Sequence, residues 1–105
     1  YEIMPSLVGS EMCIETGLLV YREDKDWLYF IESVTSVGPM DNKRIVELQE
    51  LTKNVKSGKI FVTAFLDFKT FKKFLESLAW DTEVWMVDMP DHMIHLNGDR
   101  FLGPR

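Results

Sequence analysis

The chain has 105 residues, of which 46% are hydrophobic and 28% charged, and its formal net charge is -5. This length supports one hydrophobic core, and the composition lies far from that of disordered chains. An acidic chain repels phosphate backbones, so nucleic acid is not an expected partner. Cys13 is a single cysteine without a disulfide partner, and no apolar run approaches the roughly 20 residues of a membrane span. Without a secretory signal, the sequence predicts a cytoplasmic protein with no membrane partner.

The first fifteen residues show neither a helical nor a strand period. Residues 6–14 resemble translated cloning-adapter sequence from environmental shotgun reads, which indicates a metagenomic source and leaves the native N-terminus open. An ordinary N-terminal arm that packs on the core is the alternative. We therefore divide the chain into an arm of doubtful origin, residues 1–15, and a single folded domain, residues 16–105.

A strand, a kinked loop and an amphipathic helix occupy residues 27–59, and the other elements are organised around them. Residues 17–22 and 27–37 are rich in β-branched and aromatic side chains and flank a short polar turn, which predicts an antiparallel hairpin. Both faces of the second strand are apolar in its first half, so we expect a central strand that is covered on both sides. Gly38-Pro39 ends this strand, because proline cannot donate to a ladder.

Two helices are predicted after the hairpin. The first begins near Asn42, is capped by Asp41 or Asn42, and ends at Gly58. The apolar run 60–66 predicts a buried strand, and Asp67 caps the second helix. Strands over residues 82–88 and 92–96 then pair antiparallel. The sequence thus predicts an α+β fold, a mixed α/β sheet with two main helices in the order β-β-α-β-α-β-β.

Few side chains indicate chemistry. Glu32 is the one charge in the middle of an apolar strand, where burial would raise its pKa and suit it to act as a base. A solvent-facing position or a lysine partner is the alternative for this residue. His92 and His95 are an odd step apart on a strand and face opposite sides, so no metal site is predicted. Three large tryptophans are candidates to line a groove or a dimer contact: Trp27, Trp80 and Trp85.

The segment Phe-Leu-Glu-Ser-Leu-Ala-Trp at residues 74–80 follows a strand, an aspartate and most of a helix. This arrangement, over residues 16–101, resembles the C-terminal part of the GNAT N-acetyltransferase superfamily. The resemblance implies transfer of an acyl group from acetyl-coenzyme A to a small amine, with Glu32 as the general base. It also implies that the cofactor lies along the strand end and the following loop, against these residues: Val34, Thr35, Val37, Met40, Asn42, Lys43 and Arg44.

The sequence departs from the GNAT pattern at its functional positions. The loop 38–44 lacks the glycines whose N–H groups cradle a pyrophosphate, and Asp41 brings a negative charge to that place. Leu75 stands where a tyrosine often serves as general acid. The expected function is therefore a truncated or degenerate acyl-CoA-dependent N-acyltransferase. The alternative is a non-enzymatic α+β interaction module, from a phage or an environmental microbe, that forms homodimers through exposed aromatics and an edge strand.

Overall fold

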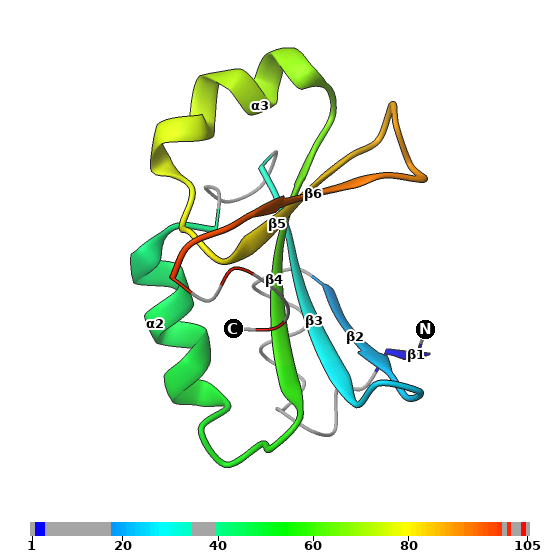
Figure 1. Cartoon of the computed structure of the whole chain (residues 1–105), viewed down its shortest axis with the longest axis vertical. Coiled ribbons are helices and arrows are strands. Elements are labelled where there is room, and N and C mark those ends of the chain that lie inside the picture. The colour runs from blue at the N-terminus through cyan, green and yellow to red at the C-terminus, as the bar shows by residue number, and fades with distance from the viewer. Residues whose placement is uncertain (1, 4–17, 35–39, 100, 102–103, 105) are drawn as a thin grey trace.

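In the part of the chain that the structure describes, a six-stranded mixed sheet carries two α-helices (Figure 1). The computed structural model describes residues 2–3, 18–34, 40–99, 101 and 104. The elements, in chain order, are β1 (Glu2–Ile3), β2 (Leu18–Arg22), β3 (Trp27–Ser33), α2 (Asn42–Leu51), β4 (Gly58–Phe65), α3 (Phe68–Phe74), the short 3-10 helix η2 (Leu75–Ser77), β5 (Thr82–Met86) and β6 (Met93–Leu96). The strands are neighbours in the same order in which they follow one another along the chain.

The direction of the strands changes across the sheet. Strands β1, β2 and β3 pair antiparallel, β3, β4 and β5 pair parallel, and β6 returns antiparallel to β5. Each parallel pair needs a crossover, and α2 and α3 supply the two crossovers. The predicted mixed α+β fold, with its β-β-α-β-α-β-β order over residues 18–96, is confirmed.

Both helices pack on one face of the sheet. Phe61 and Phe65 are an even number of residues apart on β4, so they point to the same face. Phe61 lies in a buried cluster with Ile45 and Leu48 of α2, and Phe65 lies in a second cluster with Phe71 of α3. Burial of each such side chain contributes roughly 1.5–3 kcal/mol, so these contacts fix both helices against the sheet.

The opposite face of the sheet holds an apolar groove. It has a volume of about 280 Å³ and is lined by Leu18, Val20, Tyr29, Ile31, Val62, Trp85 and Met93. Along β3 the residues alternate between buried and half-buried. The expectation that this strand is fully covered on both sides is therefore wrong, because helices lie on only one face of the described sheet.

The predicted end of the first helix was placed too late. Helix α2 ends at Leu51 rather than Gly58. The backbone leaves the helical conformation at Thr52, where φ is -111° and ψ is 20°, and the Thr52 hydroxyl donates to the Leu48 carbonyl at 2.7 Å. Gly58 instead begins β4, where a Cβ would lie 2.8 Å from a ring carbon of Trp27. Strand β3 ends at Ser33, and the predicted continuation over residues 35–37 lies outside the described residues.

The predicted helix starts are confirmed. Asp41 caps α2 through Arg44 N–H, and Asp67 caps α3 through Thr70 N–H. Of the arm 1–15, only Glu2–Ile3 belongs to the described residues, so its origin and the domain division stay predictions. Within the described part of the chain, no helix is long and apolar enough to cross a membrane.

Candidate active site

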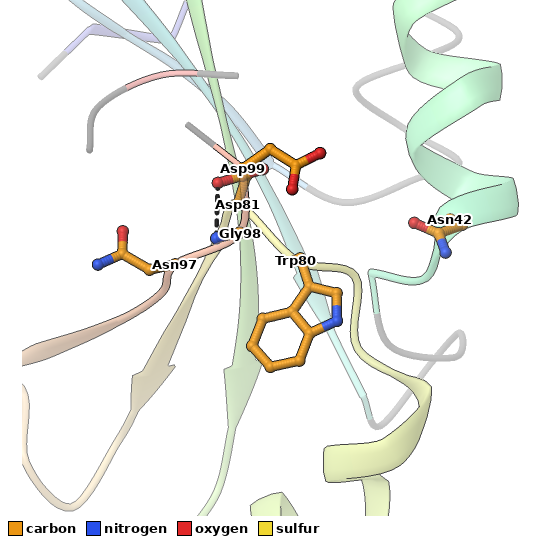
Figure 2. Close-up of a pocket in the computed structure, with 6 residues that line it drawn as sticks. All are labelled: Asn42, Trp80, Asp81, Asn97, Gly98 and Asp99. Carbon is orange, nitrogen blue, oxygen red and sulfur yellow. Dashed lines mark hydrogen bonds between the residues drawn. The ribbon is translucent and has the colours of Figure 1, made fainter. Parts of the chain in front are cut away.

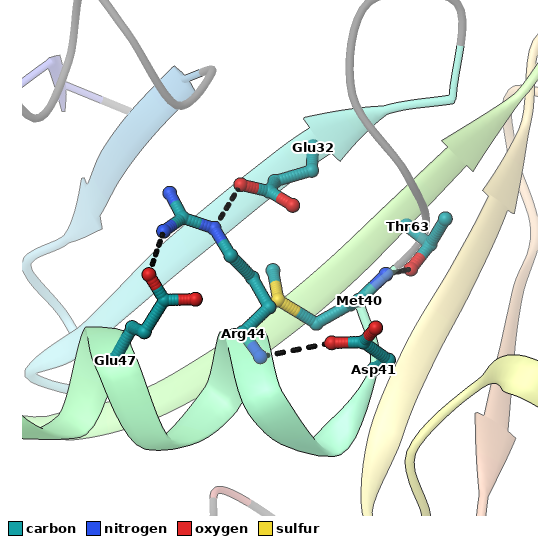
Figure 3. Close-up of polar contacts among 6 residues, drawn as sticks. All are labelled: Glu32, Met40, Asp41, Arg44, Glu47 and Thr63. Carbon is teal, nitrogen blue, oxygen red and sulfur yellow. Dashed lines mark hydrogen bonds and ion pairs between the residues drawn. The ribbon is translucent and has the colours of Figure 1, made fainter.

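A buried ion pair joins β3 to α2 (Figure 3). The Glu32 side chain is only 3% exposed, and its Oε1 accepts a hydrogen bond from Nε of Arg44 at 2.5 Å. The Arg44 side chain is 18% exposed, and its Nη1 lies 3.8 Å from Oε2 of Glu47 on the next turn of the helix. The guanidinium thus lies between a buried carboxylate and an exposed one.

Two hydrogen bonds fix the start of α2, one within the helix and one to the sheet. Asp41 Oδ1 accepts a hydrogen bond from the Arg44 N–H at 2.8 Å, which satisfies one of the free donors of the first helical turn. Met40 is fully buried, and its N–H donates to Oγ1 of Thr63 on β4 at 2.9 Å. Thr63 is the register partner of Glu32, so the same pair of strands positions both the carboxylate and the helix that supplies its partner.

The surroundings of Glu32 raise its pKa. Burial raises the pKa of Glu32 above its ordinary value, and the hydrogen bond and charge of Arg44 lower it only in part. The negative charges of Asp41 and Glu47 raise this pKa further. Such a carboxyl can hold a proton closer to neutral pH than an exposed glutamate can.

One nitrogen of Arg44 retains an unused donor. Among the described residues, Nη2 of Arg44 and Nε2 of His95 are the two buried side-chain nitrogens or oxygens without a hydrogen-bond partner. A buried cationic N–H without an acceptor is costly, and an incoming anion would satisfy it. The pair therefore combines a carboxylate with a guanidinium that can donate a further hydrogen bond to an anion.

The predicted cofactor residues lie in different environments. Arg44 pairs with Glu32, Met40 is fully buried, and Asn42 and Lys43 are exposed on the first turn of α2. Val34 packs at the edge of the second apolar cluster. Thr35 and Val37 lie outside the described residues. The role of Thr63 and the pairing of Arg44 with Glu32 were not predicted from the sequence. Thr63 could have been found only from its place on a strand parallel to β3.

A second acidic side chain pairs with a histidine on the opposite face of the sheet. Glu83 of β5 and His95 of β6 are register partners, and a carboxylate oxygen of Glu83 contacts Nδ1 of His95. Burial raises the pKa of Glu83, whereas the hydrogen bond from His95 lowers it. The two histidines are therefore in different places: His95 pairs with Glu83, and His92 is exposed just before β6.

Comparisons with known proteins point to one family. Residues 15–99 match the BsuBI/PstI restriction endonuclease domain. The type II restriction enzyme BsuBI of Bacillus subtilis is 47% identical over 87 residues, which cover 83% of this chain and 28% of that enzyme. The type II restriction enzyme AplI of Arthrospira platensis is 36% identical over 85 residues, covering 81% of this chain and 26% of that enzyme.

A solved structure agrees with these sequence relatives. The structure of the SdaI restriction endonuclease superposes with a TM-score of 0.74 at 43% identity, covering 85% of this chain and 28% of that one. This chain therefore spans less than a third of the length of the relatives that it matches.

These matches overturn the functional expectations from the sequence. The GNAT resemblance is wrong, and with it the acetyl-coenzyme A and amine partners, because the same residues match a restriction endonuclease domain. The alternative, a non-enzymatic module that homodimerises, is wrong for the same reason. The exclusion of nucleic acid is also wrong, since it relied on net charge and the relatives are restriction enzymes. The chain belongs to the BsuBI/PstI restriction endonuclease domain family.

Proposed function

We propose that this chain is the DNA-cleaving part of a type II restriction endonuclease, with Glu32 and Arg44 at its reaction centre. The observation that carries the proposal is the buried Glu32–Arg44 pair inside a domain of this family. A cytoplasmic location belongs to the same proposal, because duplex DNA would be the substrate. The proposal goes beyond membership of the family, since the chain covers only part of each relative.

The two side chains suit two parts of phosphodiester hydrolysis. Arg44 is the more exposed member of the pair, so a DNA phosphate would meet its guanidinium first. Its unpartnered Nη2 would donate to a phosphate oxygen in a charge-assisted hydrogen bond. Once Arg44 turns toward the phosphate, Glu32 would be free to accept a hydrogen bond from the attacking water and to take its proton. The raised pKa of Glu32 suits it to hold that proton.

Divalent ions serve many nucleases as a clamp on the attacking and leaving oxygens. Such ions prefer oxygen ligands, above all carboxylates. Magnesium also requires a nearly octahedral arrangement of its ligands. Within the described residues, no three of the His, Cys, Asp and Glu side chains gather closely enough to hold a metal ion. Glu32 is also already paired with a cation. The described residues alone do not fit such a site.

A net charge of -5 does not prevent DNA binding when cations gather at the site. Arg44 and Lys43 lie on the first turn of α2, next to the carboxyl-terminal ends of β3 and β4. The short helix α3 follows the carboxyl-terminal end of β4 and carries three exposed lysines: Lys69, Lys72 and Lys73. These side chains would contact DNA phosphates at the same edge of the sheet as Glu32.

The experiment that tests the proposal is digestion of a plasmid of known sequence by the purified chain in a magnesium-containing buffer. The expected result is a set of discrete duplex fragments whose ends, read by sequencing, share one short sequence. Plasmid that remains intact, or ends without a shared sequence, would contradict the proposed activity. Heat-denatured plasmid serves as the control substrate, because a duplex-specific enzyme should leave it uncut.

A further inference from the structure

Thr63 is a buried polar residue in the core of the sheet. It lies on β4, the strand that pairs in parallel with both β3 and β5, and it is fully buried. Phe61 and Phe65 lie on the same face of β4 on either side of it, and each belongs to one of the two apolar clusters. A hydroxyl buried among apolar side chains is costly unless it forms a hydrogen bond. The hydroxyl of Thr63 therefore needs a partner in the core.

The partner of this hydroxyl is the backbone of Met40. The Met40 N–H donates to Thr63 Oγ1 at 2.9 Å, and the Met40 carbonyl accepts a hydrogen bond from the Ala79 N–H at 3.0 Å. Met40 is fully buried and belongs to neither a helix nor a strand, so no regular ladder satisfies its polar groups. Two other parts of the fold hold these groups instead: β4 and the segment before β5.

Met40 leads directly into the first turn of α2, which carries Arg44. Asp41, the next residue, caps the helix by accepting a hydrogen bond from the Arg44 N–H at 2.8 Å. The Arg44 side chain then donates from Nε to Glu32 Oε1 at 2.5 Å. Glu32 is the register partner of Thr63 on the adjacent strand. The contacts thus form a closed ring through five residues, all labelled in Figure 3: Glu32, Thr63, Met40, Asp41 and Arg44.

The start of α2 also borders a pocket. Asn42 is exposed and lines a pocket of about 410 Å³ together with residues that follow η2 and β6: Trp80, Asp81, Asn97, Gly98 and Asp99. Figure 2 shows Asn42 separated from Trp80 across this pocket. Within the described part of the chain, close packing therefore does not hold the first turn of α2 from this side. The hydrogen bonds at Met40 gain importance for the placement of Arg44.

We propose that Thr63 is a positioning residue for DNA cleavage, because its hydroxyl holds the chain at Met40 and thereby places Arg44. The inference rests on the proposed function of the Glu32–Arg44 pair. Valine has nearly the shape of threonine but lacks the oxygen, so Thr63→Val would leave the buried Met40 N–H without this acceptor. Met40 would then move toward another acceptor and shift the first turn of α2 with it.

The test compares Thr63→Val with Thr63→Ser, which keeps the hydroxyl and loses only a methyl group. Single-turnover cleavage of plasmid is followed at saturating protein concentration, at a temperature where circular dichroism shows each variant to be folded. A displacement of about 1 Å can cost about 100-fold in rate, and we expect a loss of that order for Thr63→Val. Thr63→Ala, a second variant without the oxygen, should lose as much. Thr63→Ser should cleave close to the wild-type rate.

Thr52→Val is the matched control. Thr52 is also fully buried and its hydroxyl donates to the Leu48 carbonyl at 2.7 Å, but it lies at the opposite end of α2 from Arg44. This variant should unfold at lower urea concentration than the wild type and yet cleave at the wild-type rate. Hydrogen exchange of backbone amides, followed by NMR, gives a readout that does not depend on cleavage. Exchange at Met40 should rise in Thr63→Val and stay unchanged in Thr52→Val.

Wild-type cleavage by Thr63→Val, or equal losses in Thr63→Val and Thr63→Ser, would overturn the positioning role while leaving the cleavage function intact. An equal loss in Thr52→Val would do the same, because it would show that any weakening of the core slows cleavage. Unchanged exchange at Met40 in Thr63→Val would remove the hydrogen bond on which the inference depends. A wild-type chain that leaves the plasmid uncut would overturn the proposed function and this inference together.

Discussion

At the scale of single residues, the Glu32–Arg44 pair is costly to break from one side. Removing one partner of a buried ion pair leaves an uncompensated charge, which typically costs about 3–5 kcal/mol. We expect Arg44→Met to destabilise the fold by about 3 kcal/mol in urea unfolding, because Arg44 keeps some exposure. The double variant Glu32→Gln with Arg44→Met should recover much of that loss. Equal losses in the single and double variants would contradict the pairing.

Glu47→Gln is the matched control for this prediction. Glu47 faces the same guanidinium, but across 3.8 Å and with 53% of its side chain exposed. Exposed ion pairs contribute roughly 0–1 kcal/mol, so this variant should unfold close to the wild type.

The buried Glu83 predicts a pH dependence of stability. Burial raises the pKa of Glu83 above its ordinary value of 4.5, so the folded protein keeps this proton to higher pH than the unfolded chain does. The stabilising contribution is full below the unfolded pKa and is lost as pH rises through the raised one. Glu83→Gln has no such proton to lose, so it should flatten the decline in stability that urea unfolding shows as the pH rises above 4.5. A variant that declines as steeply as the wild type would refute the assignment.

The sequence identified Glu32 as a candidate site residue but did not identify the residues around it. An isolated charge in an apolar strand is visible in the sequence, because every second neighbour is hydrophobic. The partner was not visible, since Arg44 is 12 residues away and reaches Glu32 only after α2 packs on β4. The pocket lined by Asn42, Trp80 and Asn97 was harder still to predict, because three segments that are far apart in the sequence form it.

At the scale of elements, the cap of α2 has both a structural and a functional role. Asp41 accepts the Arg44 N–H, so its loss should weaken the helix start and the placement of the Arg44 side chain together. Asp41→Ala should destabilise the fold by about 1 kcal/mol in thermal or urea unfolding. Asp41→Asn keeps an acceptor oxygen and should cost much less. If the two variants were equally destabilised, the charge of Asp41 rather than its cap bond would be responsible.

Helix starts were easier to predict than helix and strand ends. Asp41 and Asp67 mark both starts correctly, because a short acceptor before an apolar stripe has a direct local cause. The end of α2 was misplaced because Val55 continues the apolar pattern of the helix, although the backbone leaves the helical conformation at Thr52. A glycine at position 58 looked like a helix cap but serves the close packing of Trp27 on β4.

At the scale of the whole molecule, element order was predictable and family was not. A sheet built from a hairpin and two crossover helices occurs in unrelated families, so topology could not separate an acyltransferase from a nuclease. The segment 74–80, on which the GNAT resemblance was based, contains the short 3-10 helix η2 and joins α3 to the residues before β5. Net charge failed as a guide to partners because it averages over the surface and hides local cations.

The local cations predict how DNA binding responds to salt. Each phosphate contact adds about 0.9 to the slope of log affinity against log salt. Lys43→Ala, next to the Glu32 centre, should weaken binding of all duplexes similarly and reduce this slope by about 1. Lys53, which follows the other end of α2, is the control and should leave the slope unchanged when replaced by alanine. Equal effects of both substitutions would contradict a localised phosphate contact.

The central claim is that Glu32 serves the cleavage of DNA rather than only the fold. The most direct test is to compare wild type, Glu32→Gln and Glu83→Gln in one plasmid digestion, with duplex affinity measured alongside. Removing a general base or acid typically costs about 100- to 10,000-fold in rate. We predict that loss for Glu32→Gln with DNA affinity retained, and near-normal cleavage for Glu83→Gln. Cleavage by Glu32→Gln at the wild-type rate would contradict the account.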